Sequence, residues 1–392
     1  MDYAGVLAYI ESYWPRITRT NQRDKETLIG LPRPYLIPSD GHMFGEMYYW
    51  DSYFMGLGVA GTEREQLIVD MAENMAALFR RFGVIPNGSR YYFLSRSQPP
   101  FFTAQIMLAY ELMQRRGDAA ADGWLRKMMR LAEREHERVW LGTQQPHARL
   151  VHAGLSRYFD TNFLDYLASC ESGWDHSTRC DDRWLAHLPV DLNAILYSRE
   201  QDFARAAEIL EQPRRAEEWG ALASARAETM TRLMWDEEAG FFFDYDYENE
   251  RRNPHLSLAG FYPLWAGLAT PEQAERAVTG VLPRFMFPGG LVTTLEQREG
   301  RQWAYPNGWA PLQWLVVAGL ERYGYTGEAA AIMRAWCDNC AAVFAATGEM
   351  WEKYNVVEIG TQPEGGVYGM VIGFGWTNAV FADFARRLGA DL

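Results

Sequence analysis

The chain has 392 residues, of which 48% are hydrophobic, and a formal net charge of −13. This hydrophobic content is sufficient for a large core, whereas the negative charge argues against nucleic-acid binding, because phosphates would be repelled. The sequence contains no basic run and no uninterrupted apolar stretch of about 18 residues, so we expect no membrane partner.

Helical periodicity runs through most of the chain. Apolar residues spaced three and four apart predict helices at 3–14, 51–60, 63–83, 101–117, 121–139, 190–211, 213–235, 271–282, 309–323, 325–346 and 374–388, with shorter ones near 179–187 and 257–267. Short segments of β-like composition interrupt them at 90–94, 240–246 and 289–295. Loops rich in Gly, Pro, Trp and Asn follow about every second helix, which is typical of helical hairpins closed into an α/α toroid. We therefore expect one all-α domain over residues 1–392, with a site at one mouth of the toroid.

Aromatic residues are unusually abundant, with 15 Trp, 21 Tyr and 20 Phe making up 14% of the chain. Aromatic rings fill protein cores, but they also stack on the apolar faces of sugar rings. The composition is therefore a weak indication of a small carbohydrate ligand.

Two loops in the first quarter of the chain combine aromatic and polar residues. EMYYWDSYF (46–54) places Trp50 and Asp51 at the start of an apolar helix, where Asp51 could equally be an N-cap. VIPNGSRYYFLSRSQPPFF (84–102) contributes Asn87, Arg96 and Gln98, whose side chains can hydrogen-bond sugar hydroxyls. The structural alternative for this loop is a turn at 86–88 followed by a helix that begins with proline.

Two further loops place carboxylates among aromatic residues. ESGWDHSTR (171–179) has Asp175 after a Gly-Trp pair, where helix capping is the simple alternative. WEKYN (351–355) has Glu352 beside an indole, where it could be a general acid or base, or half of a surface ion pair with Lys353. Such a pair meets the requirement of a glycosidase, in which one acid protonates the leaving oxygen and the other carboxylate activates water or attacks the sugar. The pattern alone does not select this pair among 51 acidic residues.

The four cysteines and seven histidines give no metal signature. Cys337 and Cys340 form a C-x-x-C in a helical segment without a second such pair, which favours two ordinary thiols over a zinc or redox pair. No H-E-x-x-H spacing occurs, and we expect neither a metal nor another cofactor. Unpaired thiols favour a reducing compartment. The first twenty residues show no signal-peptide pattern, so we expect a cytoplasmic location.

Seven stretches resemble the trehalases, glycoside hydrolase family 37, and occur in the order of that family. They are YYWDSYF (48–54), IPNGSRYYFLSRSQPPFF (85–102), ESGWDHSTR (171–179), DLNAILY (191–197), PNGWAPLQW (306–314), EKYNV (352–356) and GFGWTNAV (373–380). The resemblance implies an (α/α)6 barrel and an inverting α-glycosidase that acts on trehalose or a trehalose-like small α-glucoside. It implies that Asp175 is the general acid and Glu352 the general base. The substrate-binding residues predicted with them are Phe44, Trp50, Asp51, Asn87, Arg96, Gln98, Arg157, Gly173, Trp303 and Trp376.

The chain departs from the trehalase pattern mainly where that family contacts the second glucose. Met43 replaces an Arg, Ala304 an Asp and Val367 a Glu, and the segment after 156–160 is shorter. These changes predict an altered leaving group, with possible compensation from His42, Arg157, His176 and Glu364. The alternatives are hydrolysis of another small α-glycoside, such as glucosylglycerate or mannosylglycerate on the related family 63 barrel, and a non-catalytic sugar-binding protein.

Overall fold

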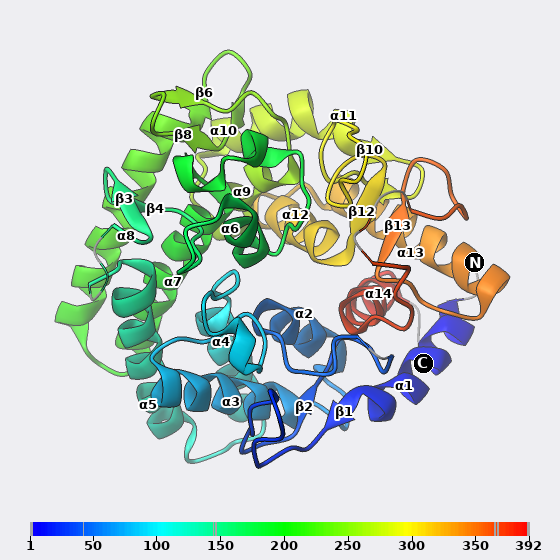
Figure 1. The fold of residues 1–392 in the computed structure, drawn as a ribbon, viewed down its shortest axis with the longest axis horizontal. Coiled ribbons are helices and arrows are strands. Elements are labelled where there is room, and N and C mark those ends of the chain that lie inside the picture. Colours follow the sequence, from blue (N-terminus) through cyan, green and yellow to red (C-terminus); the bar gives the residue numbers. More distant parts are fainter. Residues whose placement is uncertain are drawn as a thin grey trace.

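The computed structural model describes residues 3–41, 43–143, 145, 147–363, 366 and 368–389. Within these residues an inner ring of helices surrounds the centre of the molecule (Figure 1). Its members are α2 (Tyr49–Val59), α4 (Phe102–Arg115), α7 (Val190–Ile209), α9 (Tyr262–Ala266), α12 (Ala310–Arg322) and α14 (Gly375–Arg387). Each packs against the next, and α14 returns to α2, so the ring is closed.

A second set of helices covers the ring from outside. These are α1 (Tyr3–Ile17), α3 (Gln66–Phe82), α5 (Ala121–Glu135), α8 (Pro213–Met234), α10 (Pro271–Arg276) with α11 (Leu282–Phe285), and α13 (Thr326–Thr347). Among their contacts, α3 packs on α2 and α4, α8 on α7, and α13 on α12 and α14. This arrangement confirms the predicted (α/α)6 barrel.

Burial along the helices explains which of them lie inside. Inner helix α2 buries every residue except Leu57, as a helix surrounded on all sides must. Outer helix α5 buries one stripe that includes Leu125, Met128, Met129 and Ala132, and it leaves its charged face in water. Three-and-four spacing is therefore clear in an outer helix such as α5, whereas α2 is buried around nearly its whole circumference.

The sequence missed or misassigned a few short elements. Residues 90–94, expected as β-like, form a 3₁₀ turn (Tyr91–Phe93), because only Arg90 pairs with another segment, in a single bridge to Leu28. Helix α6 (Asp165–Ser172) was not predicted, because its eight residues are too few to show a clear helical period. The helix expected at 271–282 is interrupted by a π-helical turn (Ala277–Val281), and that at 121–139 ends in another (His136–Trp140). The segment 179–187 is largely 3₁₀, at Arg179–Asp182 and Trp184–Ala186. The short helix predicted near 257–267 begins as a 3₁₀ turn (Leu258–Phe261) and continues as α9.

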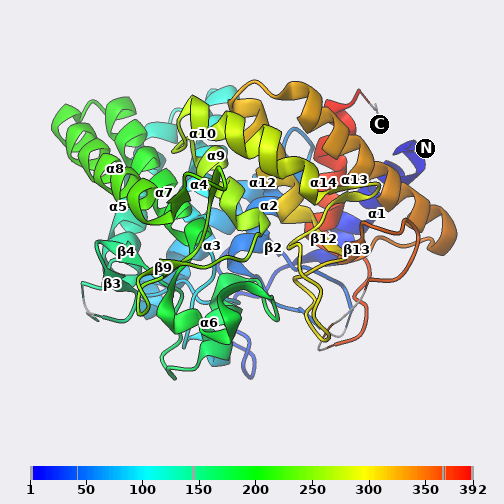
Figure 2. The same ribbon diagram turned by 90° about the horizontal axis from the view of Figure 1, so that it is seen from above.

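The strands are short and lie in the connections. They are β1 (Thr18–Arg19), β2 (Tyr35–Leu36), β3 (Leu150–His152), β4 (Leu155–Ser156), β5 (His187–Leu188), β6 (Trp235–Asp236), β7 (Phe241–Phe242), β8 (Tyr245–Asp246), β9 (Arg251–Arg252), β10 (Met286–Phe287), β11 (Gly290–Leu291), β12 (Asn307–Trp309) and β13 (Lys353–Asn355). The antiparallel pair β12–β13 sets Trp309 opposite Lys353. Figure 2 shows α6, β3, β4 and β9 toward one side of the ring, with the helices of the barrel on the other. Among the described residues, none of the helices combines the length and apolar character that crossing a bilayer requires.

Candidate active site

A pocket lies at the mouth of the ring where the inner helices begin. Trp50 and Asp51 lie in the first turn of α2, Gln98 precedes α4, and Trp376 lies in the first turn of α14. The volume of the pocket is about 140 Å³, below the range of about 300–1,000 Å³ that is common for drug-sized ligands. Of the predicted site residues, the pocket brings together Asp175, Glu352, Phe44, Trp50, Asp51, Asn87, Arg96, Gln98, Gly173, Trp303 and Trp376.

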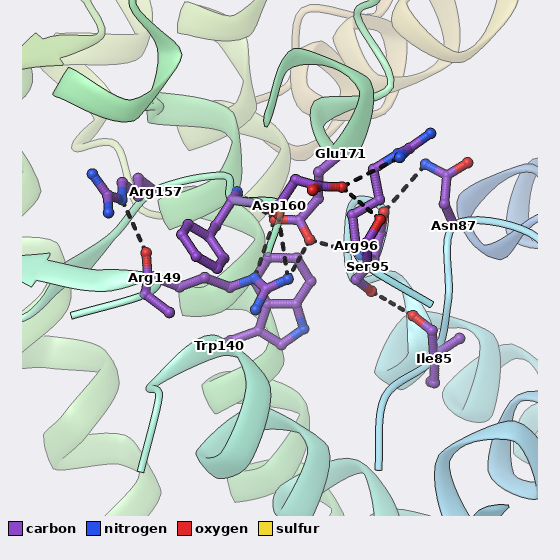
Figure 3. Close-up of polar contacts among 12 residues, drawn as sticks. Ile85, Asn87, Ser95, Arg96, Trp140, Arg149, Arg157, Asp160 and Glu171 are labelled. Carbon is purple, nitrogen blue, oxygen red and sulfur yellow. Dashed lines mark hydrogen bonds and ion pairs between the residues drawn. The ribbon is translucent and has the colours of Figure 1, made fainter. Parts of the chain in front are cut away.

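Arg157 is the predicted site residue that does not line this pocket. Its guanidinium donates to the carbonyl oxygens of His147 and Ala148 and to the Tyr247 hydroxyl, at 3.2, 2.9 and 2.9 Å. Figure 3 shows it on the opposite side of Arg149 from Arg96. Arg157 therefore ties loops together behind the site, a role that its position in the sequence does not distinguish from ligand binding.

The positions that depart from the trehalase pattern lie away from the pocket lining where the structure describes them. Met43 is 43% exposed, and Ala304 is fully buried; neither lines the pocket. His176 lines a neighbouring cavity together with Arg301. His42, Glu364 and Val367 lie outside the described residues.

The segment before Asp175 is shaped by a glycine and a stack of indoles. Gly173 ends α6 with φ +73°, and a Cβ there would lie 2.7 Å from the Trp50 ring, so the position needs glycine. Trp174 is fully buried and stacks on Trp303 at a centroid distance of 5.6 Å. These contacts hold Asp175 at the pocket, and no helix begins at Asp175, so the capping alternative does not describe it.

Four indoles build one wall of the pocket. Trp303 lies parallel to Trp309, with ring centroids 3.8 Å apart and planes within 2°. Trp50 lies 5.9 Å from Trp303, and Trp376 meets both Trp303 and Trp309 edge-on. Trp309 was missing from the predicted residue set, although the stretch PNGWAPLQW that contains it had been singled out.

Two carboxyl groups in the pocket have strongly raised pKa values. Burial raises the pKa of Asp51 to about 8, and the charges of Glu352 and Asp175 contribute to this rise. Burial also raises the pKa of Asp175 to about 7, with the positive charge of Arg96 opposing the rise and the charge of Glu352 adding to it. Asp51 is not the N-cap of α2, since that position is Tyr48. At neutral pH Asp51 is therefore largely protonated, and Asp175 is close to its titration midpoint.

Glu352 is buried and accepts two hydrogen bonds on its carboxylate. The Lys353 ammonium lies 3.0 Å from Oε2, and the Tyr368 hydroxyl donates to Oε1 at 2.9 Å. Lys353 is itself only 2% exposed, so its pair with Glu352, which the sequence offered only as a possible surface ion pair, forms inside the protein. The backbone carbonyl of Glu352 accepts the indole N–H of Trp376 at 3.1 Å, which fixes the start of β13 to α14. Tyr368, which the sequence did not suggest, comes from a loop without a helical pattern.

The amide groups in the pocket are held by one end and remain available at the other. Asn87 donates to the carbonyl oxygens of Ser97 and Cys170, at 3.2 and 3.1 Å. The side-chain oxygen of Gln98 accepts the backbone N–H of Trp50 at 3.1 Å. The Asn87 oxygen and the Gln98 NH₂ group have no such partner among the described residues, so they can bind a ligand.

A buried carboxylate behind the pocket organises this side of the site. Glu171 accepts the backbone N–H groups of Ser97 and Phe159, both at 2.7 Å, and forms an ion pair with Arg149 (Figure 3). Arg96 lies nearby and pairs with the fully buried Asp160 at 3.3 Å. Glu171 thus joins loops that are distant in sequence, and no sequence signal separated it from the other acidic residues.

The cysteines give no sign of metal or redox chemistry. All four are free and buried, and Cys337 and Cys340 lie within α13. Among the described residues, no three His, Cys, Asp or Glu side chains converge as possible metal ligands.

Comparison with known proteins places this geometry in context. A sequence model of the trehalase family matches residues 2–389. The periplasmic trehalase of Escherichia coli O1:K1 is 33% identical over 417 residues, covering 95% of this chain and 72% of the relative. That of Pseudomonas aeruginosa is 35% identical over 432 residues, covering 98% and 77%.

Solved structures show the same architecture. The neutral trehalase Nth1 from Saccharomyces cerevisiae superposes with a TM-score of 0.81 at 28% identity, over 91% of this chain and 74% of that one. The family 63 mannosylglycerate hydrolase from Thermus thermophilus, in complex with Tris and D-glycerate, has a TM-score of 0.71 at 20% identity. The match covers 97% of this chain and all of that one, and it shows the fold alone.

Proposed function

Because the chain belongs to the trehalase family and is a glycoside hydrolase, we propose that it hydrolyses trehalose, or a trehalose-like small α-glucoside, with inversion at the anomeric carbon. The observation that carries this proposal is one pocket in which a protonated carboxyl group and a hydrogen-bonded carboxylate lie among indoles. Inverting glycosidases need such a pair, one group to protonate the leaving oxygen and one to activate water.

We assign the general acid to Asp175 and the general base to Glu352. A general acid works best when its pKa is near the working pH, and the pKa of Asp175 is raised to about 7. Glu352 accepts hydrogen bonds from Lys353 and Tyr368, which suits a carboxylate that takes a proton from water. An amide at either position could not exchange a proton in its step.

Asp51 has a different task in this proposal. It is only 3% exposed and sits in the first turn of α2, whereas Asp175 follows the Gly173-Trp174 pair and is partly exposed. A protonated Asp51 can donate a hydrogen bond to a sugar hydroxyl without adding a second negative charge beside Glu352. Asn87, Arg96 and Gln98 contribute further hydrogen bonds to the ring that is held in the pocket.

Product stereochemistry tests the mechanism, and a substrate panel tests the leaving group. With trehalose, we expect the attacked glucose to appear first as the β anomer by proton NMR, before mutarotation. Measuring kcat/KM for trehalose, glucosylglycerate, kojibiose and nigerose shows which leaving group the enzyme prefers. First release of α-glucose alone would contradict inversion, and higher efficiency on glucosylglycerate would favour an acidic leaving group.

The pH dependence of the reaction follows from the raised pKa of Asp175. The acid must be protonated, so we expect kcat/KM for trehalose to fall as pH rises through about 7. The charge of Arg96 lowers the pKa of Asp175, so Arg96→Gln should move this fall to higher pH. A pH profile of both proteins is the measurement, and an unchanged midpoint in Arg96→Gln would contradict the assignment.

The cytoplasmic location stays a prediction from the sequence. The four free thiols support it, whereas the two bacterial relatives are named periplasmic.

A further inference from the structure

A second cavity lies inside the ring at the end opposite the catalytic pocket. Its volume is about 270 Å³, and its lining comes from α2, α4, α7, α9 and α12, five helices of the inner ring shown in Figure 1. Where the two linings can be compared along the chain, the residues of the second cavity come later than those of the catalytic pocket. Tyr53 follows Asp51 in α2, and Arg322 is the last residue of α12, which Trp309 precedes. The cavity is therefore at the C-terminal mouth of the inner helices.

A layer of aromatic rings separates the two cavities. Phe54 and Phe101 are fully buried, with their ring centroids 5.2 Å apart. Phe54 meets Trp50 of the catalytic pocket at 5.7 Å, and Phe101 meets Trp265 of the second cavity at 5.5 Å. A ligand in the second cavity would therefore not reach the catalytic carboxylates.

Several polar groups that line the second cavity lack partners in the described part of the chain. Tyr53 is only 7% exposed, yet its hydroxyl makes no hydrogen bond to another described residue. The Ser198 hydroxyl and the Trp265 indole N–H are likewise unpaired there, and the Arg322 guanidinium has no ion-pair partner among the described residues. Ser198 is half-buried and Arg322 is exposed, so these unpaired groups are open to water and can bind a ligand that enters the cavity.

The charges around the cavity indicate what kind of occupant fits. Burial raises the pKa of Asp202 to about 6, and the positive charges of Arg199, Arg205 and Arg322 oppose this rise. Glu111 is paired with Arg205 at 3.4 Å. Positive and negative groups therefore nearly balance, so an anion would meet Asp202 and a cation would meet Arg322. A neutral ligand avoids both conflicts.

Aromatic walls complete the chemistry of a sugar site. Tyr53, Trp265 and Trp314 line the cavity, and rings of this kind pack against the C–H faces of sugars. Hydroxyl, carboxyl, indole and guanidinium groups together can donate to and accept from several sugar hydroxyls. We propose that this cavity is a second, non-catalytic binding site for a neutral monosaccharide or small polyol. The proposal does not depend on which glycoside the catalytic pocket cleaves.

Glucose binding by isothermal titration calorimetry tests the proposal without turnover. We expect two classes of site in the wild-type protein. Tyr53→Phe and Ser198→Ala each remove one hydroxyl from the second cavity. Each should weaken glucose binding in that cavity by roughly tenfold and leave glucose binding in the catalytic pocket unchanged. Asp51→Asn should weaken glucose binding in the catalytic pocket only. Both second-cavity variants should keep wild-type kcat/KM at low sugar concentration.

Three results would overturn the proposal. One is a single class of glucose site that is lost in Asp51→Asn. Another is unchanged glucose binding in both Tyr53→Phe and Ser198→Ala, two variants that alter separate helices and so do not share a folding defect. The third is displacement of glucose from the second class by tetramethylammonium or sulfate, which would identify an ion site. None of these outcomes bears on trehalose hydrolysis, which the product NMR tests separately.

Discussion

Replacing either catalytic carboxyl group by its amide, in Asp175→Asn or Glu352→Gln, is expected to lower kcat for trehalose by about a hundredfold or more. General acid and base groups contribute about 10²–10⁴-fold to such reactions, and each amide keeps the shape of the side chain without its proton chemistry. Steady-state kinetics with trehalose provide the measurement. Glu238→Gln, which changes an exposed carboxylate, is the matched control and should be unaffected.

A substrate with a leaving group that needs no protonation separates the two roles. Fluoride departs from α-glucosyl fluoride without a general acid, so Asp175→Asn should keep most of its activity on that substrate. Glu352→Gln should lose activity on both substrates, because water must still be activated. Equal losses on α-glucosyl fluoride in the two variants would contradict the assignment of acid and base.

Loss of the Arg179 charge is expected to give the largest change in stability. Arg179 is fully buried and pairs with Asp191 at 2.8 Å and Asp244 at 2.7 Å. Its guanidinium also lies 4.4 Å from the ring centre of Trp174, next to Asp175. Arg179→Leu leaves two buried carboxylates without their partner, and breaking such a pair costs about 3–5 kcal/mol of unfolding free energy.

Urea unfolding of Arg179→Leu beside Arg301→Gln measures this cost. Arg301 pairs with Asp182, which is 47% exposed, and exposed pairs contribute about 0–1 kcal/mol. The two arginines therefore differ in burial, while both pair with aspartate. A loss below about 1 kcal/mol in Arg179→Leu would show that the buried cluster is not needed for stability.

The sequence predicted the helices well because their pattern is local. An outer helix such as α5 has to bury one stripe and solvate the rest, so its three-and-four spacing is visible in the residue order. Short elements lacked such a pattern. Helix α6 has only eight residues, and its end depends on Gly173 packing against Trp50, a contact between residues that are distant in the sequence.

The site residues divide in the same way. The stretches around Asp51, Asp175 and Glu352 could be found from residue order and family resemblance, because each is a compact motif. Their effect on one another could not be found in this way. The raised pKa values of Asp51 and Asp175 come from burial and from the charge of Glu352 across the pocket. The same holds for Lys353: a surface ion pair with Glu352 was one alternative from the sequence, and the pair lies inside the protein.

By itself, the sequence determined the helical class, the order of the motif loops and the residue types available for acid–base chemistry. Only the tertiary structure decided which side chains share a cavity. It left Arg157 outside the catalytic pocket, added Tyr368 to it, and gathered Tyr53, Asp202 and Arg322 at the opposite mouth. The physical reason is that helix periodicity acts over a few residues, whereas burial and charge act between segments that only ring closure brings together.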